Sequence, residues 1–256
     1  VAVGAERKPA VLVFGGRGGP SNALNDVHVL TLGIQWLSDD PAVADCDVAA
    51  LAWRAPSVHG EAPPPRYRHS ATALASGRAV LILGGRDAAR VFADAWLLRI
   101  HSPTSVAWER VACVSSATPI PPLFSHSAVA QAGTVYVVGG FAAPDAAHVS
   151  SATWAISLRG LEQKQTQVDA RGGGVETEGE AREGGAAVAC SVLPLPSCSR
   201  GRASHAACVL GGRWLVVAGG LLDGSQPWVE KHRTEFFDMK STEWLQLPSP
   251  STTASS

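Results

Sequence analysis

The stretch VLILGG at residues 80–85 is a run of β-forming apolar residues that ends in two glycines. The same arrangement occurs three more times along the 256 residues. The other copies are VLVFGG at 11–16, VYVVGG at 135–140 and LVVAGG at 215–220. A repeat with so long a period indicates that one segment cannot bury its apolar face alone and stacks against its neighbours.

A second apolar segment precedes the later Gly-Gly runs, and a short turn that contains glycine separates the two. In the second repeat, residues 69–74 form the first segment and residues 75–78 form the turn. Two β-type runs around such a turn predict a β-hairpin. Residues 1–16 align with residues 70–85 without a gap, so we expect the sequence to start at a repeat boundary.

Two more strands are predicted after each Gly-Gly run. A polar loop leads to a third strand, which we expect at residues 26–30, 94–98, 152–156 and 234–238. A fourth strand opens with a tryptophan in three repeats, namely at Trp53, Trp108 and Trp244. Residues 192–195 are its weak substitute in the third repeat. Four strands per unit, with glycine and aromatic residues at matching places, predict one propeller blade per repeat.

In this combination the chain resembles the kelch-repeat β-propellers, and the resemblance covers nearly everything except two insertions and the tail. It implies an all-β, kelch-type β-propeller in which four four-stranded blades are visible as part of a larger ring. The blades are expected at about 1–57, 58–118, 119–198 and 199–248. The resemblance further implies that the glycine pair ends the second strand of a blade and that the later aromatic residues pack between blades.

The residues that carry this resemblance are expected to be structural. They are Gly15, Gly16, Gly84, Gly85, Gly139, Gly140, Gly219, Gly220, His69, His126, His205, Trp53, Trp108 and Trp244. The histidines recur once per blade, whereas catalysis needs one asymmetric arrangement of groups. The chain departs from the pattern at His28, at the missing third tryptophan and in the expanded third repeat.

Two insertions and the C-terminal tail interrupt the pattern. Residues 33–52 carry scattered aspartates without the regular spacing of a calcium loop. Residues 160–187 are rich in glycine and glutamate and poor in apolar residues, so we expect this insertion to be disordered. Residues 249–256 have the composition of a linker.

Composition and charge exclude several classes of function. The formal net charge of −1 argues against binding of duplex DNA, which needs a concentrated basic face. The longest apolar runs have the length of one strand, so we expect no membrane partner. Five cysteines without a CxxC pair favour a reducing, cytoplasmic location. The histidines and cysteines show no metal-ligand spacing, and we predict no metal site.

No catalytic centre is predicted in this segment. No Ser/His/Asp order or carboxylate pair stands out from the repeats. The glycine-rich residues 15–19 precede a loop and a strand, whereas a phosphate cradle needs a helix N-terminus. We therefore expect no catalytic residue and no cofactor in the segment itself.

Function is expected in the loops that follow the Gly-Gly runs, because these loops and those entering each blade share one face. This face collects Arg17, Asn22, Arg66, Arg68, Arg86, Asp87, Phe141 and Asp223. Arg17 and Arg86 directly follow a glycine pair, and arginine is a frequent binding residue for carboxylates. The resemblance supports this role, since some kelch propellers use an arginine there to bind acidic peptides. We predict a non-catalytic module that binds a protein partner, the alternative being that these arginines are ordinary solvated loop residues.

A narrower resemblance offers a different function. Residues 53–71 and 108–128 are similar to the C-terminal kelch region of the wybutosine-synthesising tRNA methyltransferases, a leucine carboxyl methyltransferase-like family. This similarity implies an accessory propeller that shapes an active site built by another domain. S-adenosylmethionine would then bind that flanking domain, and tRNA would be a partner. No methyltransferase residues of that family occur in this chain.

Overall fold

The computed structural model describes residues 1–3, 10–31, 51–75, 77–113, 119, 121–146, 148–158, 188–222 and 234–245. Its regular elements in these ranges are all β-strands, and most of them form four antiparallel units of four strands. Within the same ranges no helix is long and apolar enough to cross a membrane. The insertion at 160–187, the tail at 249–256, most of 33–52 and Asp223 lie outside the described residues.

Each unit contains one Gly-Gly run, at the end of its second strand or just beyond it. Unit 1 consists of β1 (Ala2–Val3), β2 (Ala10–Arg17), β3 (Ala23–Thr31) and β4 (Ala52–Arg54). Unit 2 consists of β6 (Ser70–Ala73), β7 (Ala79–Leu83), β8 (Ala95–Ser102) and β9 (Ser105–Cys113). Unit 3 consists of β10 (Ser127–Gln131), β11 (Thr134–Val138), β12 (Thr153–Ser157) and β13 (Val188–Leu195). Unit 4 consists of β15 (Ala206–Leu210), β16 (Trp214–Ala218), β18 (Thr234–Asp238) and β19 (Glu243–Leu245). The four-stranded organisation of each repeat is confirmed.

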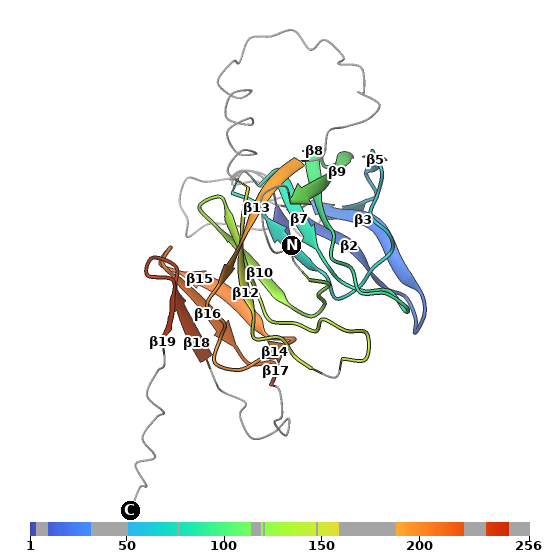
Figure 1. Cartoon of the computed structure of the whole chain (residues 1–256). Helices are drawn as coiled ribbons and strands as arrows, with labels where there is room; N and C mark the ends of the chain where they lie inside the picture. Colours follow the sequence, from blue (N-terminus) through green and yellow to red (C-terminus); the bar gives the residue numbers. More distant parts are fainter. Residues whose placement is uncertain are drawn as a thin grey trace, which may run out of the picture.

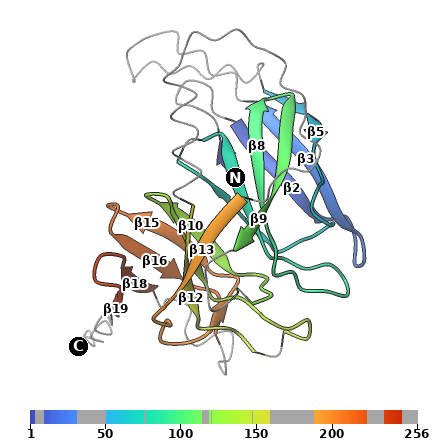
Figure 2. The same cartoon turned by 45° about the horizontal axis from the view of Figure 1, so that its top comes forward.

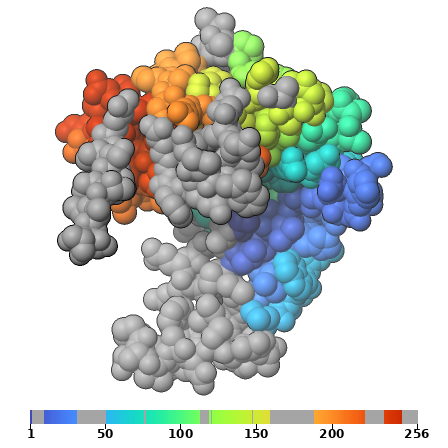
Figure 3. Space-filling model, turned by 90° about the horizontal axis from the view of Figure 1, so that it is seen from below, coloured from blue at the N-terminus to red at the C-terminus, as the bar shows by residue number. Residues whose placement is uncertain are grey.

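The units follow one another around an arc, from unit 1 in blue to unit 4 in red (Figures 1 and 3). Among the first strands, β10 lies next to both β6 and β15. Three short strands lie outside the units: β5 (Ser57–His59), β14 (Arg202–Ala203) and β17 (Leu221–Leu222). The last two pair with each other just before and after the hairpin of unit 4.

The core lies between the units, as the alternation of side chains on β7 shows. All five residues of β7 are buried. Val80 and Ile82 belong to one apolar cluster with Leu12 and Phe14 of unit 1. The intervening Leu81 belongs to a second cluster with residues of unit 3. Because side chains on a strand point alternately to opposite faces, β7 is covered by a neighbouring unit on each side. Each buried leucine or isoleucine contributes about 1.5–3 kcal/mol.

The outer edge of β9 is covered by two parallel strands. β5 pairs with Ser105–Ala107, and the start of β13 pairs with Val111–Cys113. The rest of β13 pairs with β12 of its own unit, so β13 joins units 2 and 3 into one nine-stranded sheet. Figure 2 shows β13 between β9 and β12. An uncovered edge strand is a template for aggregation, and this pairing removes that edge from unit 2.

The tryptophans of the fourth strands only partly follow the expected packing. Trp108 is buried and lies edge-on to Phe14 of unit 1, with ring centroids 4.9 Å apart. Trp244 is half-buried against Phe237, and its Nε1 donates to the carbonyl of Pro196, which leads in from unit 3. Trp53 was also expected to pack between units, but it is 59% exposed. β4 is only three residues long and lies at the outer edge of unit 1, where the described residues do not bury it.

Candidate binding face

Three short segments, which we call the entry straps, lead into units 2, 3 and 4. They are Arg66–His69, Leu123–His126 and Arg202–His205. The first residue of each strap accepts a hydrogen bond from the second glycine of the preceding unit. The N···O distances are 2.9 Å from Gly16 to Arg66, 2.7 Å from Gly85 to Leu123 and 2.8 Å from Gly140 to Arg202. The straps therefore connect each unit to the next.

The first glycine of each pair makes room for this connection. Gly15 has a φ of +59°, and a Cβ placed on it would lie 2.8 Å from the carbonyl oxygen of Arg66. Only glycine adopts such a left-handed conformation without cost and also lets another backbone approach so closely. The Gly-Gly motif thus marks the contact with the next unit as well as the end of a strand.

The third residue of every strap has a left-handed backbone although it is not glycine. Arg68, Ser125 and Ser204 have φ values of 56°, 55° and 54°. The amide of Ser204 donates to the carbonyl of Ser125, and the amide of Ser125 donates to the carbonyl of Arg68. The straps therefore form a continuous chain of backbone hydrogen bonds across units 2 to 4.

The recurring histidines connect neighbouring first strands. His126 Nε2 lies 2.9 Å from Ser70 Oγ, and His205 Nε2 lies 2.7 Å from Ser127 Oγ. Burial lowers the pKa of His126 to about 3 and the pKa values of His69 and His205 to about 4. These imidazoles are neutral near pH 7, and their contacts agree with a structural role.

We expect the free energy of unfolding to fall as the pH is lowered from about 6.5 to about 4. The folded protein holds His69, His126 and His205 neutral there, whereas the unfolded chain protonates them. Each histidine contributes up to about 1.4 kcal/mol per pH unit to the slope. Urea denaturation at several pH values measures it. The His126→Gln variant should show a smaller slope, while the exposed His101→Gln should not; equal slopes in all three proteins would contradict the assignment.

Arg66 was expected on the exposed face, but the structure places it in the interior. Its side chain is fully buried, and its Nη1 and Nη2 donate to Asp94 Oδ1 and Oδ2 at 2.6 and 2.8 Å. Nη1 also donates to the carbonyl of Gly84, and the guanidinium lies 4.3 Å from the ring centroid of Phe92. The equally buried Arg202 pairs with Glu235 in unit 4. A buried charge needs such partners, so Arg66 holds its strap in place and is not available to a ligand.

Three further arginines near the glycine pairs lie over aromatic rings; Arg17 and Arg68 are exposed and Arg86 is half-buried. The guanidinium of Arg17 lies 5.2 Å from the ring centroid of Tyr67, and that of Arg86 lies 6.0 Å from the same ring. Arg86 also lies 4.9 Å, and Arg68 6.0 Å, from the ring centroid of Phe124. We call Arg17, Arg68 and Arg86 the arginine cluster. Its arginines belong to unit 1 and to unit 2 with its strap, and Arg68 and Arg86 reach the ring of Phe124 in the strap of unit 3.

Asp87, Asn22 and Phe141 are the other residues predicted for this face that the structure describes. Asp87 accepts hydrogen bonds from the side chain and amide of Arg90. Asn22 is exposed in the loop after the first glycine pair. Phe141 is only 7% exposed, because its ring stacks on Phe124.

Tyr67 and Phe124 were not predicted as part of this face, although the guanidinium groups of the arginine cluster lie over their rings. Their common signal is positional, since each lies two residues before a repeated histidine, His69 or His126. Aligning the straps as well as the glycines would have identified them. The backbone pairing of Tyr67 with Arg86 fixes the residue after the glycines against the strap of the same unit.

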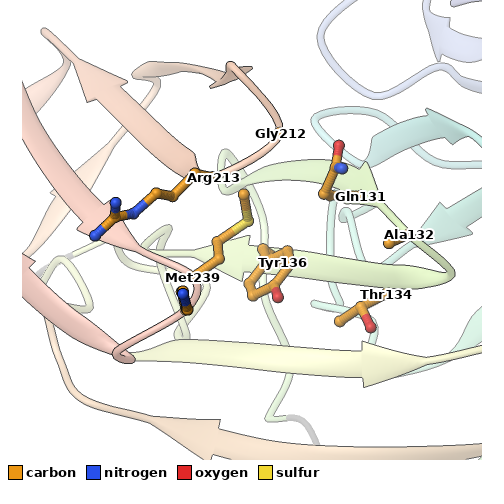
Figure 4. Close-up of a pocket in the computed structure, with 8 residues that line it drawn as sticks. Gln131, Ala132, Thr134, Tyr136, Gly212, Arg213 and Met239 are labelled. Atoms are coloured by element: carbon orange, nitrogen blue, oxygen red, sulfur yellow. The ribbon is translucent and has the colours of Figure 1, made fainter.

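A pocket of about 310 Å³ opens on the opposite face, between units 3 and 4 (Figure 4). Its lining residues are Gln131, Ala132, Thr134, Tyr136, Gly212, Arg213, Met239 and Lys240. They lie at the hairpin turns, which are at the other end of the strands from the glycine pairs. The guanidinium of Arg213 points away from Tyr136 and binds Asp238. Its charge is therefore already used, and the pocket does not extend the arginine cluster. In the described part of the chain, no group of three potential ligands could hold a metal ion.

Comparison with known proteins gives both a family and partial relatives. A model of the KLHDC2/KLHL20/DRC7 Kelch-repeats domain matches residues 38–191. The tRNA wybutosine-synthesizing protein 4 of Homo sapiens is 29% identical over 138 residues, which are 54% of this chain and 17% of the human protein. The acyl-CoA-binding domain-containing protein 5 of Arabidopsis thaliana is 28% identical over 131 residues, which are 51% of this chain and 17% of the plant protein. The chain thus spans less than a fifth of the length of either relative.

Proposed function

This chain belongs to the KLHDC2/KLHL20/DRC7 kelch-repeat family, and we propose that it binds an acidic segment of a protein partner through Arg17, Arg68 and Arg86. Kelch domains generally mediate protein binding, and no catalytic role is proposed for this segment. The observation that carries the proposal is the gathering of these guanidinium groups over Tyr67 and Phe124.

The arginine cluster suits carboxylate recognition for two reasons. Guanidinium groups bind carboxylates through paired, charge-assisted hydrogen bonds, and arginine is enriched at binding hot spots. Arg86 is also held in place, since its Nη1 donates to Pro144 and its Nε donates to Asp87, both at carbonyl oxygens. A side chain that is already ordered loses less entropy when a partner binds.

We propose in addition that the four units are blades of a β-propeller that forms a larger ring. The curved order of the units and the adjacency of their first strands support this arrangement. The loops after the glycine pairs would then meet near the axis of the ring, which is where the arginine cluster would receive an extended peptide.

The charge-reversal variant Arg17→Glu/Arg86→Glu should bind a fluorescein-labelled deca-glutamate peptide at least roughly tenfold more weakly than the unchanged chain. The reason is that two of the three positive charges of the cluster become negative. Fluorescence anisotropy at two salt concentrations measures the affinity, and thermal unfolding checks that the variant is folded.

Arg110→Glu is the matched control, because Arg110 is exposed on β9, outside the cluster. It should bind the peptide as the unchanged chain does. If Arg110→Glu weakens binding equally, or if the double variant binds normally, the arginine cluster is not the binding site.

A second function is favoured by the similarity to the tRNA wybutosine-synthesizing protein 4. Under this proposal the chain is an accessory region of an S-adenosylmethionine-dependent, tRNA-modifying methyltransferase, whose active site lies in another domain. A tRNA should then bind weakly to this chain, with an affinity that falls steeply with salt. Absence of binding even at low salt would count against direct contact between this segment and tRNA.

A further inference from the structure

The pocket between units 3 and 4 has the size of a small-molecule site and lies away from the arginine cluster. Its volume is about 310 Å³, and ligand pockets of proteins measure roughly 300–1,000 Å³. It opens beside the turn that joins Gln131 to Thr134, whereas the glycine pair of the same unit follows the other end of this hairpin. A ligand in this pocket would therefore be small and would bind independently of the acidic partner.

Strand β11 of unit 3 forms one wall of the pocket. Val135 and Val137 are buried in the apolar cluster shared with unit 2. Because side chains alternate along a strand, Thr134 and Tyr136 point the other way, toward unit 4. The ring of Tyr136 lies 6.4 Å from that of Phe237 in unit 4. This wall thus combines an aromatic surface with the hydroxyl of Thr134.

Two turns of unit 4 form the opposite wall, and Asp238 holds both of them. Its carboxylate accepts a hydrogen bond from the amide of Lys240 at 2.9 Å and pairs with Arg213. The guanidinium of Arg213 also lies 4.6 Å from the ring centroid of Trp214. The amide of Met239 donates to the carbonyl of Arg213 at 3.0 Å. This wall is ordered without a ligand, which reduces the entropy that binding would cost.

The polar groups of the pocket can still bind a ligand. Among the described residues, Lys240 forms no ion pair, and the side chains of Gln131 and Thr134 form no hydrogen bond. Gly212 leaves the amide of Gln131 accessible, since a Cβ on this glycine would lie 3.4 Å from the amide nitrogen. Asp238 already neutralises Arg213, so the ammonium group of Lys240 gives the pocket a positive charge. This charge favours an anionic ligand.

The apolar part of the pocket favours an aromatic group. Figure 4 shows the side chain of Met239 next to the ring of Tyr136, and both line the pocket. A thioether sulfur makes favourable contacts with aromatic rings, and methionine adapts its shape to them. Tyrosine adds stacked or edge-on contacts with a second ring.

We propose that this pocket binds a small aromatic carboxylate. The ring of the ligand packs between Met239 and Tyr136, and its carboxylate accepts hydrogen bonds from Lys240 and from the side chain of Gln131 or Thr134. The carboxylate needs the ammonium group because Lys240 is the unpaired cation among the described residues that line the pocket. Phenylacetate is the simplest ligand with both parts.

Met239 is the only methionine in the chain, so its methyl group reports on the pocket directly. In the full chain labelled with ¹³C at the methionine methyl group, phenylacetate should shift this NMR signal in a saturable way. Phenylacetamide has the same shape without the charge and should bind roughly three- to tenfold more weakly. The Arg17→Glu/Arg86→Glu variant should bind phenylacetate as the unchanged chain does, which separates this pocket from the arginine cluster.

The Lys240→Gln variant should bind phenylacetate as weakly as phenylacetamide, while its affinity for phenylacetamide should not change. Lys240 is exposed, so we expect this variant to fold, and thermal unfolding checks that it does. Arg110→Gln controls for a general loss of positive charge and should bind both ligands normally. The proposal is overturned if phenylacetate gives no saturable shift, if both ligands bind the unchanged chain equally, or if Arg110→Gln weakens phenylacetate binding as much as Lys240→Gln.

Discussion

The Asp94→Ala variant should be less stable than the unchanged chain by about 3–5 kcal/mol, because it leaves a buried guanidinium without its carboxylate. Arg66 is fully buried and donates to both oxygens of Asp94, which also accepts from Trp96. Removing one partner of such a pair costs much more than the pair contributes when it is complete. The free energy of unfolding, measured by urea denaturation, tests this expectation.

Two further variants decide whether the buried charge is the cause. Asp26 has the position in unit 1 that Asp94 has in unit 2, because Phe14 pairs with Val27 as Leu83 pairs with Ala95. The Asp26 side chain is half exposed, so Asp26→Ala should change the free energy of unfolding by less than about 1 kcal/mol. Asp94→Ala combined with Arg66→Met removes both charges and should recover part of the loss. Equal losses at Asp26 and Asp94 would show that burial of the pair does not matter.

The Gly139→Ala variant is the second substitution with a large expected effect, and Gly219→Ala is its matched control. The two glycines have φ values of +65° and +70°, so alanine imposes a similar backbone cost of about 1–3 kcal/mol at both. At Gly139 the added Cβ also collides with the carbonyl of Arg202 in the next unit. Overpacking adds about 1–3 kcal/mol, so Gly139→Ala should be the more destabilised variant.

Comparing the stability losses of Gly139→Ala and Gly219→Ala isolates the contribution of the contact with the next strap. Around Gly219 the described residues leave the position of a Cβ open to 4 Å. Urea denaturation of both variants gives the difference in the free energy of unfolding. If the two losses are equal, the contact with the next strap is not what requires glycine at the first position of the pair.

The repeat pattern was sufficient to predict the strands, because glycine pairs and strand-like runs are local signals. The hairpins before the glycines and the third strands lie where the sequence places them. The pairing of β13 with β9 was not predictable in this way, since it joins residues 188–190 to residues 111–113 across a long separation. Trp53 illustrates a related limit: its position in the repeat matches Trp108, but its exposure depends on which unit lies beside it.

The candidate face was predictable only in outline. The sequence identifies arginines near the glycine pairs, and the structure separates them by their partners. Arg66 is buried because Asp94, 28 residues later, lies opposite it. Arg68 is only two residues from Arg66, yet it is exposed, because its left-handed backbone turns the strap at that point. No local property of the sequence distinguishes these two arginines.

The hydrogen bond from the second glycine of one unit to the strap of the next has a consequence for measurements of local opening. The amides of Gly16, Gly85 and Gly140 are held by atoms of a different unit. Their protons can exchange with solvent only when that junction separates, even if the strand that carries them stays intact. Deuterium uptake at these three positions would therefore record the opening of each junction separately. The glycine amide that exchanges fastest would identify the junction between units that opens most readily.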